Sequence, residues 1–535
     1  MNSIHEHLKI WNVKNQAALD GGGKSRQEKQ REAGKKTARE RLDLLLDTDS
    51  FEEIDRLAIS QFLGTQDTEY TDGVVTGFGT INGRKVALYA QDFTMRGGSL
   101  GARHAEKICK IMDLAAKVGC PIIGLIDSGG ARIDEGIHAL SGYSKIFMRN
   151  SRYSGVIPQI SVILGPCAGG AVYSPALTDF IFMTEHISQM FITGPQVIEQ
   201  VLHEKVTKEE LGGSGVHGTK SGVAHVISTS EEACFISVKQ LLSYLPGNYC
   251  EATPVIEVKR SSPSIPQGER QTLLGAHAEP VEAYERDLQA LIPANSSQSY
   301  DIKNIINTLV DHASFFELQP TFAANIITGL ARIEGSVIGI VANQPLVKAG
   351  TIDIDASCKA ARFIRMCDSF GIPIISLVDV PGYLPGVDQE HHGIIRHGAK
   401  LLYAYATATV TKITVILRKA FGGAYIVMGS KELGTDFNFA WPQAQIAVLG
   451  AKAAVTILHG KKLAQAEPDN RHELQKALES EYETEFLNPF VAAEHGYIDS
   501  IIEPNKTREH IVKALSICSD KVEVLPKKKH GNMPL

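Results

Sequence analysis

The chain repeats itself at an offset of about 252 residues, and this duplication constrains its fold more than any other feature. Residues 118–127 (VGCPIIGLID) match residues 370–379 (FGIPIISLVD), and residues 162–171 (VILGPCAGGA) match residues 415–424 (VILRKAFGGA). The register slips by only one residue between the two pairs of strings. A repeat of this length predicts two homologous domains, each with its own core.

Each half carries the same order of expected elements. An apolar run (86–90; 337–342) predicts a buried strand, and a helical stretch follows it (104–118; 357–370). A second apolar run ends in Asp127 or Asp379, and a glycine-rich loop, a helix, a third apolar run and Gly-Gly-Ala complete the unit. This alternation predicts α/β domains with parallel strand pairing. We place the domains at 1–265 and 266–535, joined by a Pro- and Ser-rich linker within 253–300 and preceded by a helical extension.

Composition excludes several functional classes. No apolar run approaches the roughly 20 residues that a bilayer span needs, and the N-terminus has no signal or transit pattern, so we expect a cytoplasmic protein outside the membrane. The formal net charge of −6 argues against nucleic-acid binding. Eight scattered cysteines form no Cys-x-x-Cys pair, and no histidine spacing suggests metal ligands, so we predict no metal site.

Two glycine turns carry the predicted chemistry: Gly169-Gly170-Ala171 and Gly422-Gly423-Ala424 each follow an apolar strand and precede a helix. Backbone N–H groups at such a helix N-terminus can bind an oxyanion, and losing one donor of this kind typically costs about 3–4 kcal/mol. Close packing of helix on strand is the alternative role of a single glycine pair. Because the pair recurs in both halves, the sequence favours a reaction in which two carbonyl-type oxygens are polarised.

Two other functions remain as alternatives. Residues 97–101 match the Gly-x-Ser-x-Gly nucleophile elbow of serine hydrolases, but that fold gives no reason for a duplicated chain. A non-catalytic scaffold with degenerate sites is disfavoured because both glycine pairs are intact.

Several long strings in this chain resemble those of one enzyme family. They are GKKTARERL (34–42), DSGGARIDEG (127–136), GPCAGGAVYSP (165–175), the string 393–404 and RKAFGGAYIV (418–427). Over nearly its whole length the chain resembles the carboxyltransferase (β) subunits of biotin-dependent acyl-CoA carboxylases, closest to the propionyl-CoA carboxylase type. Asp134 stands where Gln is usual, and Met95-Arg96 stand where Val-Phe is usual, which puts details of the acyl pocket in doubt.

The resemblance implies two crotonase-type (ClpP/crotonase) domains. It implies that acyl-CoA binds the N-terminal domain and that carboxybiotin binds the C-terminal domain of a neighbouring subunit in a homo-hexamer, a trimer of dimers. The chain has no Met-Lys-Met attachment site and no ATP-grasp region, so the biotin must be carried and carboxylated by a separate biotin carboxylase/biotin carrier α subunit.

Site roles follow from the same resemblance. Gly169 and Gly170 are assigned to the thioester oxygen and Gly423 and Ala424 to the ureido oxygen of biotin, with the reverse allocation left open. Further residues are expected to line the two pockets: Gly129, Gly130, Ala131, Arg132 and Ile426 for acyl-CoA, and Gly422 and Tyr425 for biotin. No side chain has to act as base, because a ring nitrogen of biotin takes the α-proton.

The resemblance favours propionyl-CoA as substrate, giving methylmalonyl-CoA, with acetyl-CoA as a second acceptor. Relatives restricted to propionyl-CoA commonly have Asp at the position of Ile426, so Ile426 predicts relaxed acyl selectivity unless it only packs beneath its loop. Three sibling functions stay open: the carboxyltransferase subunit of a methylmalonyl-CoA decarboxylase, that of a transcarboxylase, and the β subunit of methylcrotonyl-CoA carboxylase.

Overall fold

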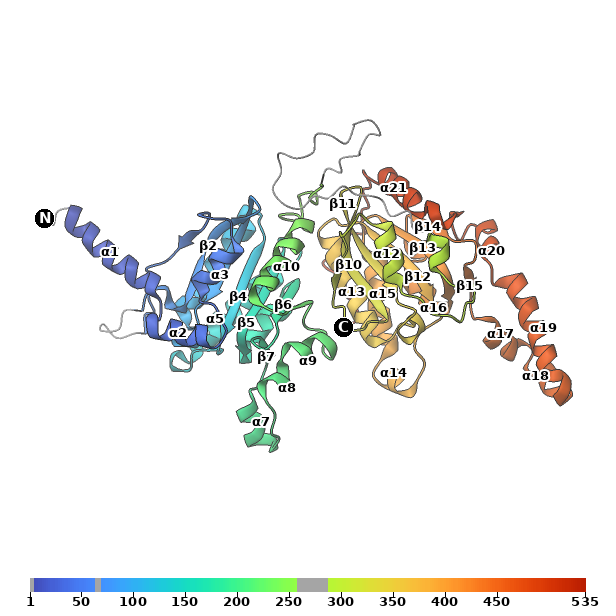
Figure 1. The fold of residues 1–535 in the computed structure, drawn as a ribbon, viewed down its shortest axis with the longest axis horizontal. Helices are drawn as coiled ribbons and strands as arrows, with labels where there is room; N and C mark the ends of the chain where they lie inside the picture. Colours follow the sequence, from blue (N-terminus) through green and yellow to red (C-terminus); the bar gives the residue numbers. More distant parts are fainter. Residues whose placement is uncertain (1–3, 63–68, 257–286) are drawn as a thin grey trace, which may run out of the picture. The chain divides into compact units, whose positions relative to one another are not determined.

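The computed structural model describes residues 4–62, 69–256 and 287–535. The chain divides into two compact units, Met1–Ala252 and Thr253–Leu535, and each unit contains one eight-stranded sheet (Figure 1). The predicted domain boundary at 265/266 lies outside the described residues.

The sheet of the first unit has the order β1-β2-β3-β4-β5-β6-β8, with β7 paired to β5. Its strands are β1 Glu52–Ile54, β2 Val74–Ile81, β3 Arg84–Gln91, β4 Ile122–Ser128, β5 Gln159–Ala168, β6 Phe180–Thr184, β7 Gln189–Phe191 and β8 Val226–Ser228. The pairs β1–β2 and β2–β3 are antiparallel, and every later pair is parallel.

The sheet of the second unit repeats this pattern, with the order β9-β10-β11-β12-β13-β14-β16 and β15 paired to β13. Its strands are β9 Phe316–Leu318, β10 Ile326–Ile333, β11 Ser336–Asn343, β12 Ile374–Val380, β13 Lys412–Phe421, β14 Phe437–Ala440, β15 Gln445–Ala447 and β16 Ser500–Ile501. Again the first two pairs are antiparallel and the others parallel. The duplication seen in the sequence is therefore a duplication of sheet topology.

The antiparallel hairpin at the start of each sheet departs from the expected all-parallel pairing. Asn82 (φ 51°) and Gly83 (φ 74°) form the two-residue turn between β2 and β3, and Glu334 (φ 49°) and Gly335 (φ 78°) form its counterpart. Turns with positive φ at both central residues match the twist of paired strands, which explains the hairpin.

Helices cover both faces of the first sheet. They are α1 Ile4–Asp20, α2 Lys24–Glu32, α3 Ala38–Leu45, α4 Ala102–Val118, α5 Ile137–Tyr153, α6 Tyr173–Leu177, α7 Pro195–Leu202, α8 Lys208–Gly212, α9 Ser214–Thr219 and α10 Glu231–Tyr244. Helices α4 and α5 share one apolar core with the sheet, and α3 and α10 pack on the other face. The predicted N-terminal helical extension is confirmed as α1 to α3, and α1 extends away from the sheet of its unit (Figure 1).

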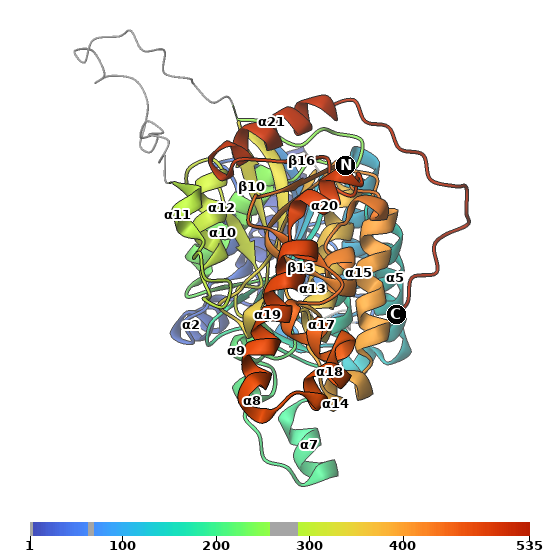
Figure 2. The same cartoon turned by 90° about the vertical axis from the view of Figure 1, so that its right-hand side faces the viewer.

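The second sheet is covered in the same way. Its helices are α11 Leu288–Leu291, α12 Ile302–Leu309, α13 Ile354–Ser369, α14 Val387–His391, α15 Ile394–Thr407, α16 Gly422–Val427, α17 Ala451–Leu458, α18 Gly460–Gln465, α19 Pro468–Phe486, α20 Pro489–Glu494 and α21 Thr507–Ile517. Helices α13 and α15 pack against each other, and α11, α12 and α21 share a core with the sheet. Figure 2 shows α17, α18 and α19 gathered at one side of this unit. No helix among the described residues is long and apolar enough to cross a bilayer.

Both sheets carry an irregularity at the same place. Ile126 pairs with Ile163 but Ser128 pairs with Cys167, so β5 has two extra residues opposite Asp127. In the second sheet Val378 pairs with Ile416 and Val380 with Ala420, which leaves two extra residues opposite Asp379. Bulges of this kind bend a strand and redirect the chain beyond the bend, and in both units that chain is the glycine turn.

Candidate active site

The first glycine turn begins where β5 ends. Residues Gly169–Val172 form a short 3-10 helix that leads directly into α6, and Gly169 has φ 63°, a value that favours glycine. The residue before the turn, Ala168, has no side chain that can cap the helix. No side chain among the described residues caps the N–H groups at the start of this turn, and both glycines are partly exposed.

The second turn repeats this geometry at the end of β13. Helix α16 begins at Gly422, which has φ 57°, and Phe421 before it offers no side-chain cap. Gly423 is exposed, and a methyl group added to it would meet no atom within 4 Å. The space on the side-chain position of Gly423 is therefore open to a ligand. Burial raises the pKa of Tyr425 on the same helix, so its hydroxyl stays protonated.

The predicted loop Gly129–Arg132 lies against the first turn. Leu100 and Ala131 form an isolated parallel bridge, in which the Leu100 N–H donates to Gly130 and the Arg132 N–H donates to Leu100. This pattern turns the N–H of Ala131 away from Leu100. A methyl group at Gly130 would lie 2.9 Å from the Ala168 carbonyl oxygen, so the loop and the turn are in close contact. The bridge between Ile352 and Tyr383 repeats the arrangement in the second unit.

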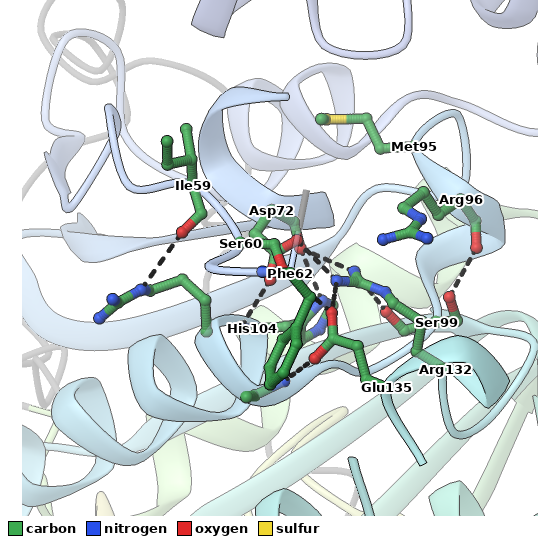
Figure 3. A network of polar contacts seen from close by, with 12 residues as sticks. Ile59, Ser60, Phe62, Asp72, Met95, Arg96, Ser99, His104, Arg132 and Glu135 are labelled. Carbon is green, nitrogen blue, oxygen red and sulfur yellow. Dashed lines mark hydrogen bonds and ion pairs between the residues drawn. The ribbon is translucent and has the colours of Figure 1, made fainter. Parts of the chain in front are cut away.

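The Arg132 side chain is placed differently from a direct substrate ligand. It is buried and pairs with Asp72 at 2.7 Å and with Glu135 at 2.7 Å, as Figure 3 shows. Its Nη2 also donates to the Ser99 carbonyl oxygen at 2.9 Å. Burial opposes the charge of Glu135, but hydrogen bonds from the Ala102 N–H and from Arg132 lower the pKa of this carboxyl group. The Arg132 guanidinium thus fixes the Gly129–Arg132 loop to other residues of the first unit.

His104 extends this network as a neutral residue. Burial lowers the pKa of His104 well below its usual value. Its Nδ1 lies 3.0 Å from the Asp72 carbonyl oxygen, which can only accept, so Nδ1 carries the proton and Nε2 accepts from Gln91 at 3.3 Å. The Gln91 side-chain oxygen accepts in turn from the Asp127 N–H at 3.3 Å. Hydrogen bonds therefore connect the Asp72 end of the Arg132 network, through His104 and Gln91, to Asp127 at the end of β4.

Sequence reasoning missed the side chains that surround Asp127. Arg41 and Lys35 both pair with this buried carboxylate, and Arg41 also pairs with Glu231. The signal was available, because both cations lie in the string 34–42, but that string carried only a resemblance and no chemical role.

Other predicted or weighed residues lie apart from these contacts. Ile426 on α16 is 46% exposed. Ser99 of the hydrolase-like string donates to the Arg96 carbonyl oxygen, as in a structural turn. One thiol–imidazole contact exists in the second unit, where Cys358 Sγ lies 3.1 Å from His397 Nδ1 between α13 and α15, and burial raises the pKa of Cys358. Within residues 4–62, 69–256 and 287–535, no group of three or more His, Cys, Asp or Glu side chains could hold a metal ion.

A matched pair of uncapped glycine turns, one in each half of a duplicated chain, can polarise two carbonyl-type oxygens. The sequence model of the carboxyl transferase domain matches residues 29–533. The chain belongs to the carboxyl transferase family. This membership confirms the resemblance and the predicted fold class, two homologous α/β domains, and identifies the chain as an enzyme of acyl-CoA carboxyl transfer.

Known carboxyl transferases resemble the chain throughout its length. It is 53% identical to the propionyl-CoA carboxylase beta chain of Saccharopolyspora erythraea, over 98% of this chain and 94% of that protein. It is 50% identical to the methylmalonyl-CoA decarboxylase subunit alpha of Propionigenium modestum, over 96% of each. The structure of transcarboxylase 12S, a hexamer with methylmalonyl-CoA bound, matches with a TM-score of 0.93 and 44% identity over 100% of this chain and 99% of that one.

Proposed function

We propose that this carboxyl transferase moves a carboxyl group from carboxybiotin to the α-carbon of a short acyl-CoA, with propionyl-CoA as its main acceptor and methylmalonyl-CoA as product. The observation that carries the proposal is the pair of glycine turns at equivalent strand ends of the two sheets. The relatives that act on propionyl-CoA and methylmalonyl-CoA support the choice of acyl group.

In the first unit, the turn at Gly169 and Gly170 serves the thioester. Removing the α-proton places negative charge on the thioester oxygen, and N–H donors aimed at that oxygen lower the cost of forming it. The Gly129–Ala131 loop, which contacts this turn, forms the adjacent wall of the acyl-CoA pocket. Arg132 supports that wall through its ion pairs with Asp72 and Glu135.

In the second unit, the turn at Gly423 and Ala424 serves the ureido oxygen of biotin. The exposed Gly423 backbone fits a flat ureido ring, because no atom lies within 4 Å of the position that a side chain would fill. Gly422 shapes the turn and Tyr425 supplies the neighbouring surface for biotin, whereas Ile426, exposed on the same helix, borders the acyl group. When bound, carboxybiotin supplies the carboxyl group and then a ring nitrogen basic enough to accept the α-proton.

The enzyme works with partners in this proposal. Biotin arrives on a biotin carboxylase/biotin carrier α subunit, and the chain assembles as a homo-hexamer built as a trimer of dimers, consistent with the hexamer of transcarboxylase 12S. We expect this assembly in the cytoplasm.

The opposite direction of transfer is a second candidate function. The methylmalonyl-CoA decarboxylase subunit of Propionigenium modestum and transcarboxylase 12S are both similar over the full chain. Stabilising both oxygens lowers the barrier to transfer in either direction, so the partner subunits decide which direction the cell uses.

The test is a carboxylation assay with the purified chain and a biotin carboxylase/biotin carrier subunit from the same cells. ATP and labelled bicarbonate are supplied with acetyl-, propionyl-, butyryl- or methylcrotonyl-CoA. The proposal expects label in methylmalonyl-CoA as the fastest product. Labelling of methylcrotonyl-CoA alone would assign the sibling function, and no labelling of any ester by an active partner would reject the carboxylase.

A further inference from the structure

Asp127 and Asp379 lie at equivalent bulges, each fully buried at the end of a strand and each facing two extra residues of the neighbouring strand. A glycine turn begins within five residues of each bulge. The direction in which the strand leaves the bulge therefore sets where the N–H donors point. A buried carboxylate at this place needs a cation, and the two units supply it differently.

In the second unit the cation belongs to the bulge itself. Arg418 Nε lies 3.0 Å from Asp379 Oδ2, and the Lys419 N–H donates to Asp379 Oδ1 at 3.1 Å. Both donors are consecutive residues of β13, and the turn begins three residues after Lys419. The second turn is thus held by its own strand.

In the first unit the residue equivalent to Arg418 is Gly165, which has no side chain. A methyl group at Gly165 would lie 2.0 Å from Asp127 Oδ1, so the carboxylate occupies the space of the missing side chain. The cations come instead from the N-terminal extension: Arg41 Nη1 lies 2.9 Å from Asp127 Oδ2, and Lys35 Nζ lies 2.7 Å from Asp127 Oδ1.

Arg41 also holds the bulge directly. Its Nη2 donates to the Leu164 carbonyl oxygen at 2.7 Å, and Leu164 is one of the bulge residues. The side chain is fully buried, and its remaining charge is balanced by Glu231 of α10 at 2.9 and 2.8 Å. Arg41 therefore connects four segments that are far apart in sequence: α3, the end of β4, the bulge of β5 and α10.

We infer that Arg41, assisted by Lys35, is a positioning residue for the first glycine turn, and that Arg418 is its counterpart for the second. The inference rests on the proposed function and deepens it by assigning each arginine to one substrate. The N-terminal extension is accordingly part of the acyl-CoA side of the enzyme. Donors displaced by about 1 Å can cost about 100-fold in rate, so loss of either arginine should slow transfer while each affects its own substrate.

The experiment measures transfer of the carboxyl group from methylmalonyl-CoA to free biotin by the full-length chain. Arg41→Met is expected to lower kcat at least about 30-fold and to raise the KM for methylmalonyl-CoA, with the KM for biotin within twofold. Arg418→Met should show the reverse pattern of KM values. Arg41→Lys should recover part of kcat, because an ammonium can still reach Asp127.

Glu231→Gln is the matched control. It removes the other ion pair of Arg41 but leaves the bonds to Asp127 and Leu164, so Tm should fall while kcat and both KM values stay within about twofold. If Arg41→Met does not form the native oligomer, Lys35→Met replaces it, with the same pattern and a loss of about fivefold.

With an active wild type, three results for Arg41→Met would overturn the inference. They are an unchanged kcat, an equal change in both KM values, and the same behaviour as Glu231→Gln. An inactive wild type would instead count against the proposed function.

Discussion

Lys107 and Lys359 occupy equivalent positions in the two units, and each buried side-chain amino group donates to backbone carbonyl oxygens in or just before the second strand of its sheet. Lys107 donates to Thr71 at 2.9 Å and to Val74, beside β2. Lys359 donates to three carbonyl oxygens at 2.8–2.9 Å, those of Gln319, Phe322 and Ile326, beside β10. Both copies of the duplicated fold thus have an internal lysine that donates hydrogen bonds to the backbone carbonyl oxygens of an irregular segment.

Replacing Lys359 by Met should destabilise the second unit by about 3 kcal/mol or more. The substitution keeps much of the side-chain volume but leaves three buried carbonyl oxygens without this donor, and each such group costs about 1–3 kcal/mol. Urea unfolding followed by circular dichroism measures the change. Lys513→Met on the exposed face of α21 is the control and should change stability by less than about 0.5 kcal/mol. Equal midpoints for the two variants would contradict this role.

The contribution of Lys359 should also depend on pH. Burial lowers the pKa of Lys359 to about 7 from its ordinary value of 10.5. Below pH 7 both folded and unfolded chains hold the proton, so the contribution is constant. Between pH 7 and about 10 the unfolded chain binds more protons, and stability from this residue rises by up to about 1.4 kcal/mol per pH unit. The stability difference between wild type and Lys359→Met should therefore widen from pH 7 to pH 9. A difference that stays level from pH 6 to pH 9 would be inconsistent with the shifted pKa.

Gly423→Ala should leave the fold intact and abolish most activity. Gly423 has no positive φ and its new methyl group would meet no protein atom within 4 Å, so Tm should be unchanged. That methyl group fills the space through which the ureido oxygen approaches, so kcat/KM for biotin should fall about 100-fold or more. Gly460→Ala is a matched control, since Gly460 also has open space around it and lies at the start of α18. Full activity in Gly423→Ala would show that this turn does not bind the reacting oxygen.

Ile426→Asp should narrow the range of acyl groups. Ile426 is partly exposed on α16, directly after the glycine turn, so its replacement changes the wall of the site more than the core. The ratio of kcat/KM values for acetyl-, propionyl- and butyryl-CoA measures the effect, and the variant should favour propionyl-CoA more strongly than the wild type. An unchanged ratio would mean that Ile426 does not contact the acyl group.

Much of the fold was predictable because the repeat supplied two independent copies of one pattern. Strands, helices and glycine turns recur at a constant offset, and the predicted elements at 86–90, 104–118, 337–342 and 357–370 coincide with β3, α4, β11 and α13. The antiparallel hairpins were missed because no strand was predicted at 74–81 or 326–333, where β2 and β10 lie.

The supporting charges were less predictable. Arg132 was assigned to the acyl-CoA pocket by resemblance alone, and its ion pairs with Asp72 and Glu135 were not predicted, because Asp72 lies 60 residues earlier in the chain. Arg41 and Asp127 are separated by 86 residues, and no local pattern joins them. Local sequence patterns predict the glycine turns that supply the N–H donors. Ion pairs between residues far apart in the sequence can be identified only in the folded chain.

The most direct measurement of the central claim is carboxyl transfer from methylmalonyl-CoA to free biotin by the purified chain, without any other subunit. The account predicts biotin-dependent conversion of methylmalonyl-CoA to propionyl-CoA, abolished in Gly423→Ala and retained in Gly460→Ala. A folded chain that converts no methylmalonyl-CoA, malonyl-CoA or methylcrotonyl-derived ester in the presence of biotin or of a biotin carrier domain would contradict it.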